Sequence, residues 1–198
     1  NRIFNNRIRN NMTISALNTK KDFIYVVDNF FEDDYFQKLK NYVVQQNYPA
    51  RAGDYGGDNN KMYHHIVLDT DSDHCQHTYK TIKKQFDYEI GLDDEYLQSF
   101  LFLSFGHETP KVHQDKCMFN CMIYIQGETL LENGTSFYIR SKEDEFVLHS
   151  VLGFKENRAV LFDGSIFHAS SQYMKSSRPR YVMTNFIWSK EDKKRADK

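Results

Sequence analysis

Residues 110–126 read PKVHQDKCMFNCMIYIQ, so a short polar segment leads directly into a run of apolar residues. The run from Cys117 to Gln126 is apolar and aromatic, which predicts a buried strand. His113 and Asp115 lie just before it. Taken alone, this His-x-Asp pair is either a metal-binding pair or two polar residues at the end of a loop. Evidence from the rest of the sequence is needed to choose between these two interpretations.

Short apolar runs of the same kind follow one another from about residue 96, with turns between them and almost no helical pattern. Six or seven strands at near-regular spacing predict a sandwich or a barrel. We therefore expect a double-stranded β-helix (a jelly roll, cupin-like) as the core of the chain, at about residues 97–188. The runs are YLQSFLFLSF (96–105), CMFNCMIYIQ (117–126), TSFYIR (135–140), EFVLHSVLGF (145–154), RAVLFDG (158–164) and RYVMTNFIW (180–188).

The N-terminal half mixes strand and helix patterns. FIYVVDNF (23–30) and YHHIVLD (63–69) are rich in β-branched and aromatic residues and predict strands. FEDDYFQKLKNYVVQQ (31–46) has apolar residues at helical spacing and acids in its first turn, and residues 71–91 have an Asp or Ser cap and a terminal glycine. The predicted class is α+β, with N-terminal helices packed on one face of the jelly roll.

The length of 198 residues predicts a single domain. We place this domain at residues 21–189, between an irregular segment at 1–20 and a charged tail at 190–198. Residues 49–60, PARAGDYGGDNN, form a predicted loop because of their Gly, Asp and Asn content. Two interpretations of this loop remain open, a substrate-binding loop near the mouth of the barrel and a simple spacer.

Composition narrows the classes of partner. The formal net charge of −1 gives no electrostatic reason to expect nucleic acid. No apolar stretch approaches the roughly 20 residues of a membrane span, so no membrane partner is expected. The three cysteines are odd in number and form no C-x-x-C, which argues against a disulfide framework and favours a reducing, cytoplasmic location. Nothing in the sequence specifies an oligomeric state.

A third candidate ligand favours the metal-binding interpretation of the His-x-Asp pair. In an extended segment, His113 and Asp115 project to the same side because they are two residues apart. His168 follows the run RAVLFDGSIF (158–167). Two imidazoles and one carboxylate make the facial triad of non-haem Fe(II) oxygenases, whose open positions admit a chelating cosubstrate and O₂. The carboxylate at position 115 favours hydroxylation over halogenation, because a small apolar residue there would leave room for a halide.

The last predicted strand carries a further signal in RPRYVMTNFIW (178–188). An arginine at the start of an apolar strand needs an anion if it is buried, and its planar fork suits a carboxylate. Arg178 and Arg180 both qualify, and Pro179 between them cannot donate to a strand ladder.

The order H113-x-D115, H168 and R180-Y-V-M-T-N-F resembles the Fe(II)/2-oxoglutarate-dependent dioxygenases, in particular the branch that contains prolyl hydroxylases. In that branch the strand after HxD ends in an I-Y-(Y/I)-L-N type sequence, here CMIYIQ. The distal His precedes an R-Y-(A/V)-(I/M)-T strand, here RYVMT. The resemblance covers roughly residues 97–188. Because the match from Tyr181 onward is well anchored, it favours Arg180 over Arg178.

The resemblance implies a cofactor set of Fe(II), 2-oxoglutarate and O₂, with ascorbate as an optional reductant. It implies that the metal is bound by His113, Asp115 and His168, which are also the catalytic residues. It further implies that Arg180 pairs with the distal carboxylate of 2-oxoglutarate and that Tyr124 hydrogen-bonds the cosubstrate. Two more residues are expected to line the same cavity because they share strand parity with these two, namely Thr184 and Asn120.

The implied function is an Fe(II)- and 2-oxoglutarate-dependent hydroxylase. It would act on a C–H bond of a protein or peptide side chain, as prolyl hydroxylases do, or of a small molecule, and it would convert 2-oxoglutarate to succinate and CO₂. The alternative is a non-catalytic cupin-like module that binds a metal and a small anion. A zinc patch at His74, Cys75 and His77 is disfavoured, because only the two histidines share a helical face and no second pair is evident.

Overall fold

The computed structural model describes six ranges, residues 14–19, 22–52, 62–90, 96–104, 111–171 and 178–188. The predicted charged tail at 190–198 and positions 53–60 of the predicted loop lie outside these ranges, as do residues 1–13.

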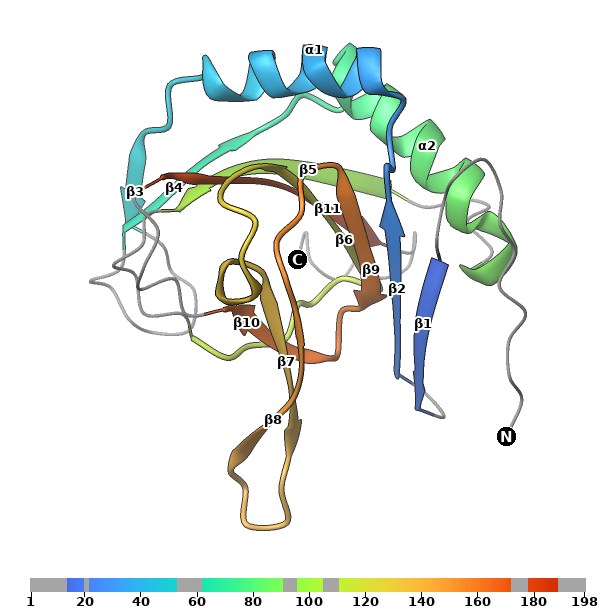
Figure 1. Cartoon of the computed structure of the whole chain (residues 1–198), viewed down its shortest axis with the longest axis vertical. Helices are drawn as coiled ribbons and strands as arrows, with labels where there is room; N and C mark the ends of the chain where they lie inside the picture. The colour runs from blue at the N-terminus through green and yellow to red at the C-terminus, as the bar shows by residue number, and fades with distance from the viewer. Residues whose placement is uncertain are drawn as a thin grey trace.

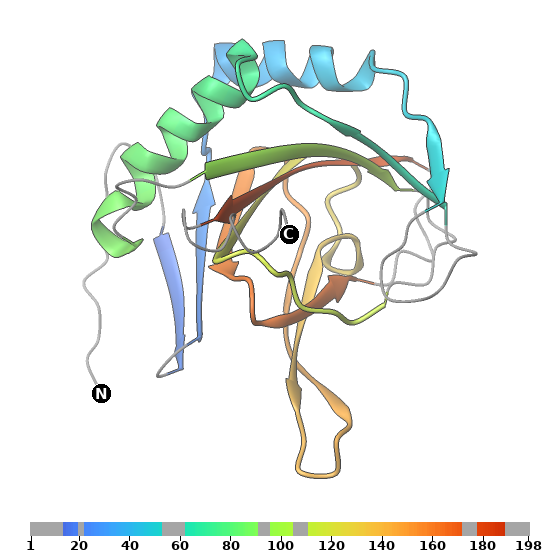
Figure 2. The ribbon, with the colours of Figure 1, turned by 180° about the vertical axis from the view of Figure 1, so that it is seen from behind.

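Two antiparallel sheets face each other. The larger has eight strands in the order β1-β2-β9-β6-β11-β5-β4-β3, and the smaller has three in the order β10-β7-β8 (Figures 1 and 2). This arrangement is the predicted jelly roll. The strands are β1 Ile14–Thr19, β2 Asp22–Asp28, β3 Ala50–Ala52, β4 Met62–Val67, β5 Tyr96–Ser104, β6 Phe119–Gln126, β7 Thr135–Arg140, β8 Phe146–Leu152, β9 Arg158–Asp163, β10 Phe167–Ser170 and β11 Arg180–Trp188.

Two α-helices lie across the larger sheet, on the side away from the smaller one (Figure 1). They are α1, Asp33–Val44, and α2, Asp73–Ile90, and a short 3₁₀ helix, Leu131–Asn133, precedes β7. Acids begin both α-helices, as the helix dipole favours. None of the helices in the described ranges is long and apolar enough to cross a membrane.

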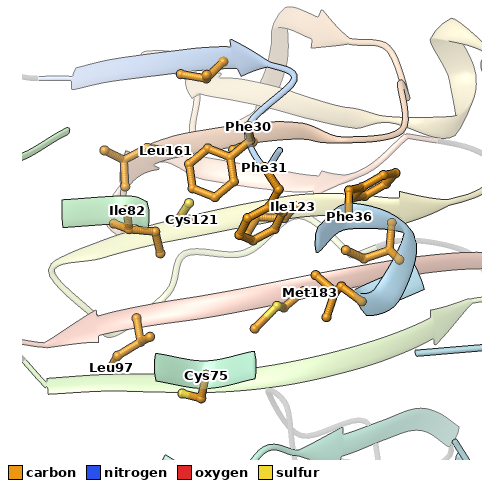
Figure 3. Close-up of a cluster of buried hydrophobic side chains, with 14 of the residues drawn as sticks. Phe30, Phe31, Phe36, Cys75, Ile82, Leu97, Cys121, Ile123, Leu161 and Met183 are labelled. Atoms are coloured by element: carbon orange, nitrogen blue, oxygen red, sulfur yellow. The ribbon is translucent and has the colours of Figure 1, made fainter. Parts of the chain in front are cut away.

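The space between the helices and the larger sheet is filled by an apolar core (Figure 3). On the central strands β6 and β11 this core takes alternate residues, because successive side chains of a strand point to opposite faces. Helix α1 contributes Phe36, Leu39 and Val43, and α2 contributes Ile82 and Phe86. The strand residues on this face are Cys121, Ile123, Ile125, Met183 and Ile187.

The other face of β6 and β11 looks into the roll, toward the smaller sheet. Its apolar part contains Met122, Tyr124 and Val182, which cluster with Phe137 and Phe162. Even-numbered residues of β6 and β11 therefore line the interior of the roll. The predicted site residues Asn120, Tyr124, Arg180 and Thr184 all belong to this set.

Three strands depart from the sequence-based prediction. Residues 14–19 were expected to be irregular, but they form β1, an edge strand paired only with β2. Part of the expected loop forms β3, which pairs with β4. The short strand β10 was not predicted separately, although it carries His168. These strands are held by backbone hydrogen bonds to their neighbours, and their own residues carry only a weak strand signal.

Strands β7 and β8 form a hairpin that projects from the body of the protein (Figures 1 and 2). Its outer part is apolar and exposed, with Ile139, Phe146, Val147 and Leu148 all among the exposed large hydrophobic side chains.

Candidate metal centre

His113, Asp115 and His168 meet at one edge of the interior of the roll. One potential ligand atom from each lies within 4.8 Å of the others. Nε2 of His113 is 3.8 Å from Oδ1 of Asp115, and Nε2 of His168 is 3.4 Å from Oδ2. The side chain of His113 is 49% exposed and that of His168 only 5%. The cluster is thus open to solvent on one side and closed on the other.

Backbone hydrogen bonds hold the two histidines side by side. The N–H of His113 donates to the carbonyl of His168 at 3.0 Å, and the N–H of His168 donates back at 2.9 Å. The N–H of Asp115 donates to the carbonyl of Gly164 at 2.8 Å. At Gly164 a Cβ would lie only 2.1 Å from the carbonyl oxygen of Cys117, so this close approach requires glycine.

Each histidine is oriented by its second ring nitrogen. Nδ1 of His113 lies 2.9 Å from the carbonyl oxygen of Lys111, and Nδ1 of His168 lies 2.9 Å from that of Ile166. A carbonyl oxygen can only accept, so Nδ1 carries the proton and Nε2 keeps its lone pair. This is the tautomer that metal-binding histidines use, with the outer hydrogen bond fixing the ring.

Burial also favours the uncharged form of His168. Removal from water lowers the pKa of its imidazole, and the nearby His113 lowers it further, while the carboxylate of Asp115 opposes the shift. A neutral imidazole is the form that binds a metal. Two imidazoles and one carboxylate brought together in this way form a donor set that suits Fe(II) and would leave coordination positions for other ligands.

Asn120 contacts the cluster directly. Its side-chain amide donates from Nδ2 to Oδ2 of Asp115 at 2.7 Å. The residue is buried on the interior face of β6. Sequence reasoning placed Asn120 in the site by strand parity but did not reveal this contact, because the bend between Asp115 and β6 has no sequence signature.

Arg180 and Tyr124 lie together further along the same face. Arg180 is only 4% exposed at the start of β11, and its Cζ is 5.6 Å from the centre of the Tyr124 ring. The Tyr124 hydroxyl is buried and donates to Oγ1 of Thr135 at 2.8 Å. Burial raises the pKa of Tyr124, although the charge of Arg180 partly opposes the shift. Arg178, by contrast, is exposed.

The surroundings of Arg178 differ from those of Arg180. Arg178 lines a separate surface pocket that includes Lys40 and Glu156, which form an ion pair of 2.6 Å. None of the candidate metal or cosubstrate residues lines that pocket. Position in the fold therefore favours Arg180 as the arginine that faces the interior of the roll.

Strand register orders the polar residues of the interior face. Asn120 of β6 lies opposite Phe186 of β11, whereas Tyr124 lies opposite Val182. Thr184, buried between these two levels, lies opposite Met122. Asn120 and Tyr124 are four steps apart along the strand, which corresponds to about 13 Å. The interior face thus has one polar end beside the metal cluster and another at Arg180.

The remaining candidates have structural explanations. His77 stacks on Tyr35 with ring centres 3.6 Å apart, and Nδ1 of His74 lies 3.1 Å from the Tyr35 hydroxyl, so both histidines join α2 to α1. Across the described ranges, no second group of His, Cys, Asp or Glu side chains gathers closely enough to hold a metal. Cys117 and Cys121 are buried, as expected for core residues.

The fold and the His-Asp-His cluster define a jelly-roll protein with a candidate metal centre. The sequence matches no protein-family profile, and it matches no curated protein. Solved structures do share its fold. The non-haem α-ketoglutarate-dependent epimerase SnoN from nogalamycin biosynthesis aligns over 84% of this chain and 78% of its own, with a TM-score of 0.63 and 9% identity.

Two further structures are similar. HygX from Streptomyces hygroscopicus, with nickel, 2-oxoglutarate and hygromycin B bound, aligns over 84% of this chain and 83% of its own, with a TM-score of 0.64 and 6% identity. A prolyl-4-hydroxylase from Pseudomonas putida aligns over 84% and 92%, with a TM-score of 0.57 and 12% identity. The shared fold confirms the jelly-roll prediction.

Proposed function

We propose that the protein is an Fe(II)- and 2-oxoglutarate-dependent oxygenase. The observation that carries the proposal is the cluster of His113, Asp115 and His168, in which both histidines donate from Nδ1 to the backbone and turn Nε2 toward the carboxylate. Two of the structural neighbours support it, since SnoN is α-ketoglutarate-dependent and HygX was crystallised with 2-oxoglutarate.

In this proposal the chain holds Fe(II) through Nε2 of each histidine and the carboxylate of Asp115. Bound Fe(II) and 2-oxoglutarate would supply an oxidative decarboxylation, in which one atom of O₂ enters succinate, the other enters a substrate C–H bond, and CO₂ leaves. Arg180 would bind the distal carboxylate of 2-oxoglutarate, since a buried guanidinium needs an anion. Tyr124 and Thr184 would line the same cavity, and ascorbate would serve as an optional reductant.

We further propose that the reaction is a hydroxylation of a protein or peptide side chain, or of a small molecule with an apolar surface. Phe137 lies opposite His168 in the β7–β10 ladder, and Ile139 is two residues further along the same face of β7. Ile139 pairs with Val147 of β8, and both are exposed. The face that carries His168 therefore continues as an exposed apolar surface, which suits the docking of such a substrate.

A reducing, cytoplasmic location is part of the proposal. It is supported by Cys75, Cys117 and Cys121, none of which forms a disulfide in the part of the chain that the structure describes.

The test begins with purified protein held anaerobically with Fe(II) and 2-oxoglutarate. We expect the weak visible charge-transfer absorption of a chelated keto acid, followed by release of succinate once air is admitted. Asp115→Ala should lose both signals. His149→Ala, which changes an exposed histidine of the hairpin, is the matched control and should retain them. Candidate peptides that gain the mass of one oxygen atom would then identify the substrate.

One outcome would reject the enzyme. If the protein binds Fe(II) but gives neither the absorption nor succinate, with or without candidate substrates, it is a cupin-like binding module instead.

A further inference from the structure

We infer that Asn120 is a positioning residue that fixes the orientation of the Asp115 carboxylate. The inference rests on the proposed function, since it assigns Asp115 to a metal. The contact between the two residues is short and direct, with Nδ2 of Asn120 2.7 Å from Oδ2 of Asp115. A carboxylate only accepts hydrogen bonds, so the amide nitrogen and not the amide oxygen must face it.

The contact makes the two carboxylate oxygens unequal. Oδ2 accepts the hydrogen bond from Asn120 and lies 3.4 Å from Nε2 of His168, while Oδ1 lies 3.8 Å from Nε2 of His113 and accepts no bond from Asn120. Rotation of the carboxylate about its last bond would break this hydrogen bond. Asn120 thereby limits the ways in which Asp115 can present its oxygens to a bound ion.

The two residues differ in how firmly they are held. Asn120 is the second residue of β6, a strand with neighbours on both sides, and it lies opposite Phe162 of β9 and Phe186 of β11. Asp115 lies outside any named strand, and its backbone N–H is held by the carbonyl of Gly164. The rigid sheet therefore orients the loop carboxylate through the Asn120 amide, and not the reverse.

The amide oxygen of Asn120 argues against a direct role of this residue in binding 2-oxoglutarate. Oδ1 is buried, and within the described residues it has no hydrogen-bond partner. As an acceptor it would repel the carboxylates of 2-oxoglutarate and would favour a donor such as water or a substrate hydroxyl. The contact that Asn120 makes is to the metal ligand.

The experiment uses the full-length, metal-free protein and Mn(II) as the probe, titrated by calorimetry. Asn120→Leu keeps nearly the shape of the side chain and removes the N–H donor without adding a charge, so it isolates the hydrogen bond from the volume. Asn120→Ala removes both. We expect each variant to bind Mn(II) about 10- to 100-fold more weakly than the parent, as changes to the groups that orient metal ligands do. The visible spectrum of bound Co(II) should shift as well, since the carboxylate geometry changes.

Asn185→Leu is the matched control. Asn185 is equally buried on the neighbouring strand β11 but bonds to Ser99 and to the carbonyl of Cys121, which belongs to the helix-side core. A folded Asn185→Leu variant should bind Mn(II) and give the Co(II) spectrum as the parent does, because a purely structural role affects neither.

The outcomes distinguish this inference from the proposed function. If both Asn120 variants bind Mn(II) within about twofold of the parent and leave the Co(II) spectrum unchanged, Asn120 does not position Asp115. A parent that binds no divalent metal overturns the inference as well. A parent that binds Mn(II) but never forms succinate refutes the oxygenase alone, and weaker Mn(II) binding by the Asn120 variants would then still support the inference.

Discussion

The two faces of strands β6 and β11 use alternate residues of the same sequence for different purposes. The face toward the helices carries Cys121, Ile123 and Met183, which pack into the apolar core shared with α1 and α2. The face toward the smaller sheet carries Asn120 and Arg180 instead, both buried. A strand period of two residues thus places Asn120 and Arg180 on the face opposite the helix-side core.

The comparison is clearest for a single residue type. On the helix side, Asn185 accepts from the Ser99 hydroxyl at 2.7 Å and donates to the carbonyl of Cys121 at 2.9 Å, so both ends of its amide are used. On the interior side, Asn120 uses its nitrogen on Asp115, while its oxygen finds no partner among the described residues. The protein therefore satisfies the amide of Asn185 at both ends and that of Asn120 at its nitrogen.

The largest expected effect comes from the interior face. His168→Ala removes a buried ligand, and we expect Mn(II) affinity to fall by more than about 100-fold, beyond the range for changes to outer groups. Calorimetric titration measures it, with circular dichroism to confirm that the variant is folded. Unchanged affinity would show that the cluster is not a metal centre.

The opposite face should affect stability and not metal binding. Ile123 is fully buried in the helix-side core, so Ile123→Ala should lower the free energy of unfolding by about 2–5 kcal/mol, through lost burial and a residual cavity. Urea denaturation measures this loss. The Mn(II) affinity of the folded variant should match that of the parent, and a large loss of affinity would mean that the two faces are coupled.

A third substitution tests the far end of the polar face. Arg180→Ala should weaken binding of 2-oxoglutarate by about 10- to 100-fold while Mn(II) affinity stays within about twofold, because the proposed charge-assisted pair with the cosubstrate would be lost. Arg180→Lys keeps the charge without the fork and should fall between the two. Exposed Arg178 provides the control, and a loss of cosubstrate binding in Arg178→Ala alone would move the assignment to that residue.

The smallest effect should lie outside both faces, at the end of β2. Burial raises the pKa of Asp28, but hydrogen bonds and charges from Arg158 and Lys155 outweigh it and hold the pKa below its ordinary value of 3.8. The ion pair therefore stabilises the fold above pH ~3.9, the pKa of an unfolded Asp, and its contribution is lost as the pH falls through the lower folded pKa. Arg158 Nε lies 2.6 Å from Oδ1 of Asp28.

Asp28→Asn should accordingly cost about 1–2 kcal/mol of stability at neutral pH, and less at low pH, as a partly exposed pair allows. Urea denaturation at several pH values checks it, with Glu145→Gln at an exposed site as the control. A loss that is constant down to the lowest pH would contradict the linkage.

Much of this arrangement could be predicted from the sequence because the signals are local. Short apolar runs with turns between them predicted the central strands, and the order of His113, Asp115 and His168 predicted which side chains the fold brings together. The edge strand β1 was missed because ISALNT is only weakly apolar and depends on β2 for its pairing. The contact from Asn120 to Asp115 could not be predicted, since it arises where the chain bends into β6.

The sequence could not decide between Arg178 and Arg180 by composition, because both precede the same strand. The two arginines differ in burial, since Arg180 is buried and Arg178 is exposed. This difference depends on where β11 begins to pair with β5, which is at Arg180 opposite Ser104. Register is a property of the assembled sheet.

The reciprocal pair of backbone hydrogen bonds between His113 and His168 bears on how the protein keeps its fold without a metal. The candidate ligands come from distant parts of the sequence, yet backbone hydrogen bonds hold them adjacent. If the cluster binds a metal as proposed, binding would require little conformational ordering, unlike that of small domains that fold only around their metal. A chelator would then leave a folded protein that can bind a divalent ion again without refolding.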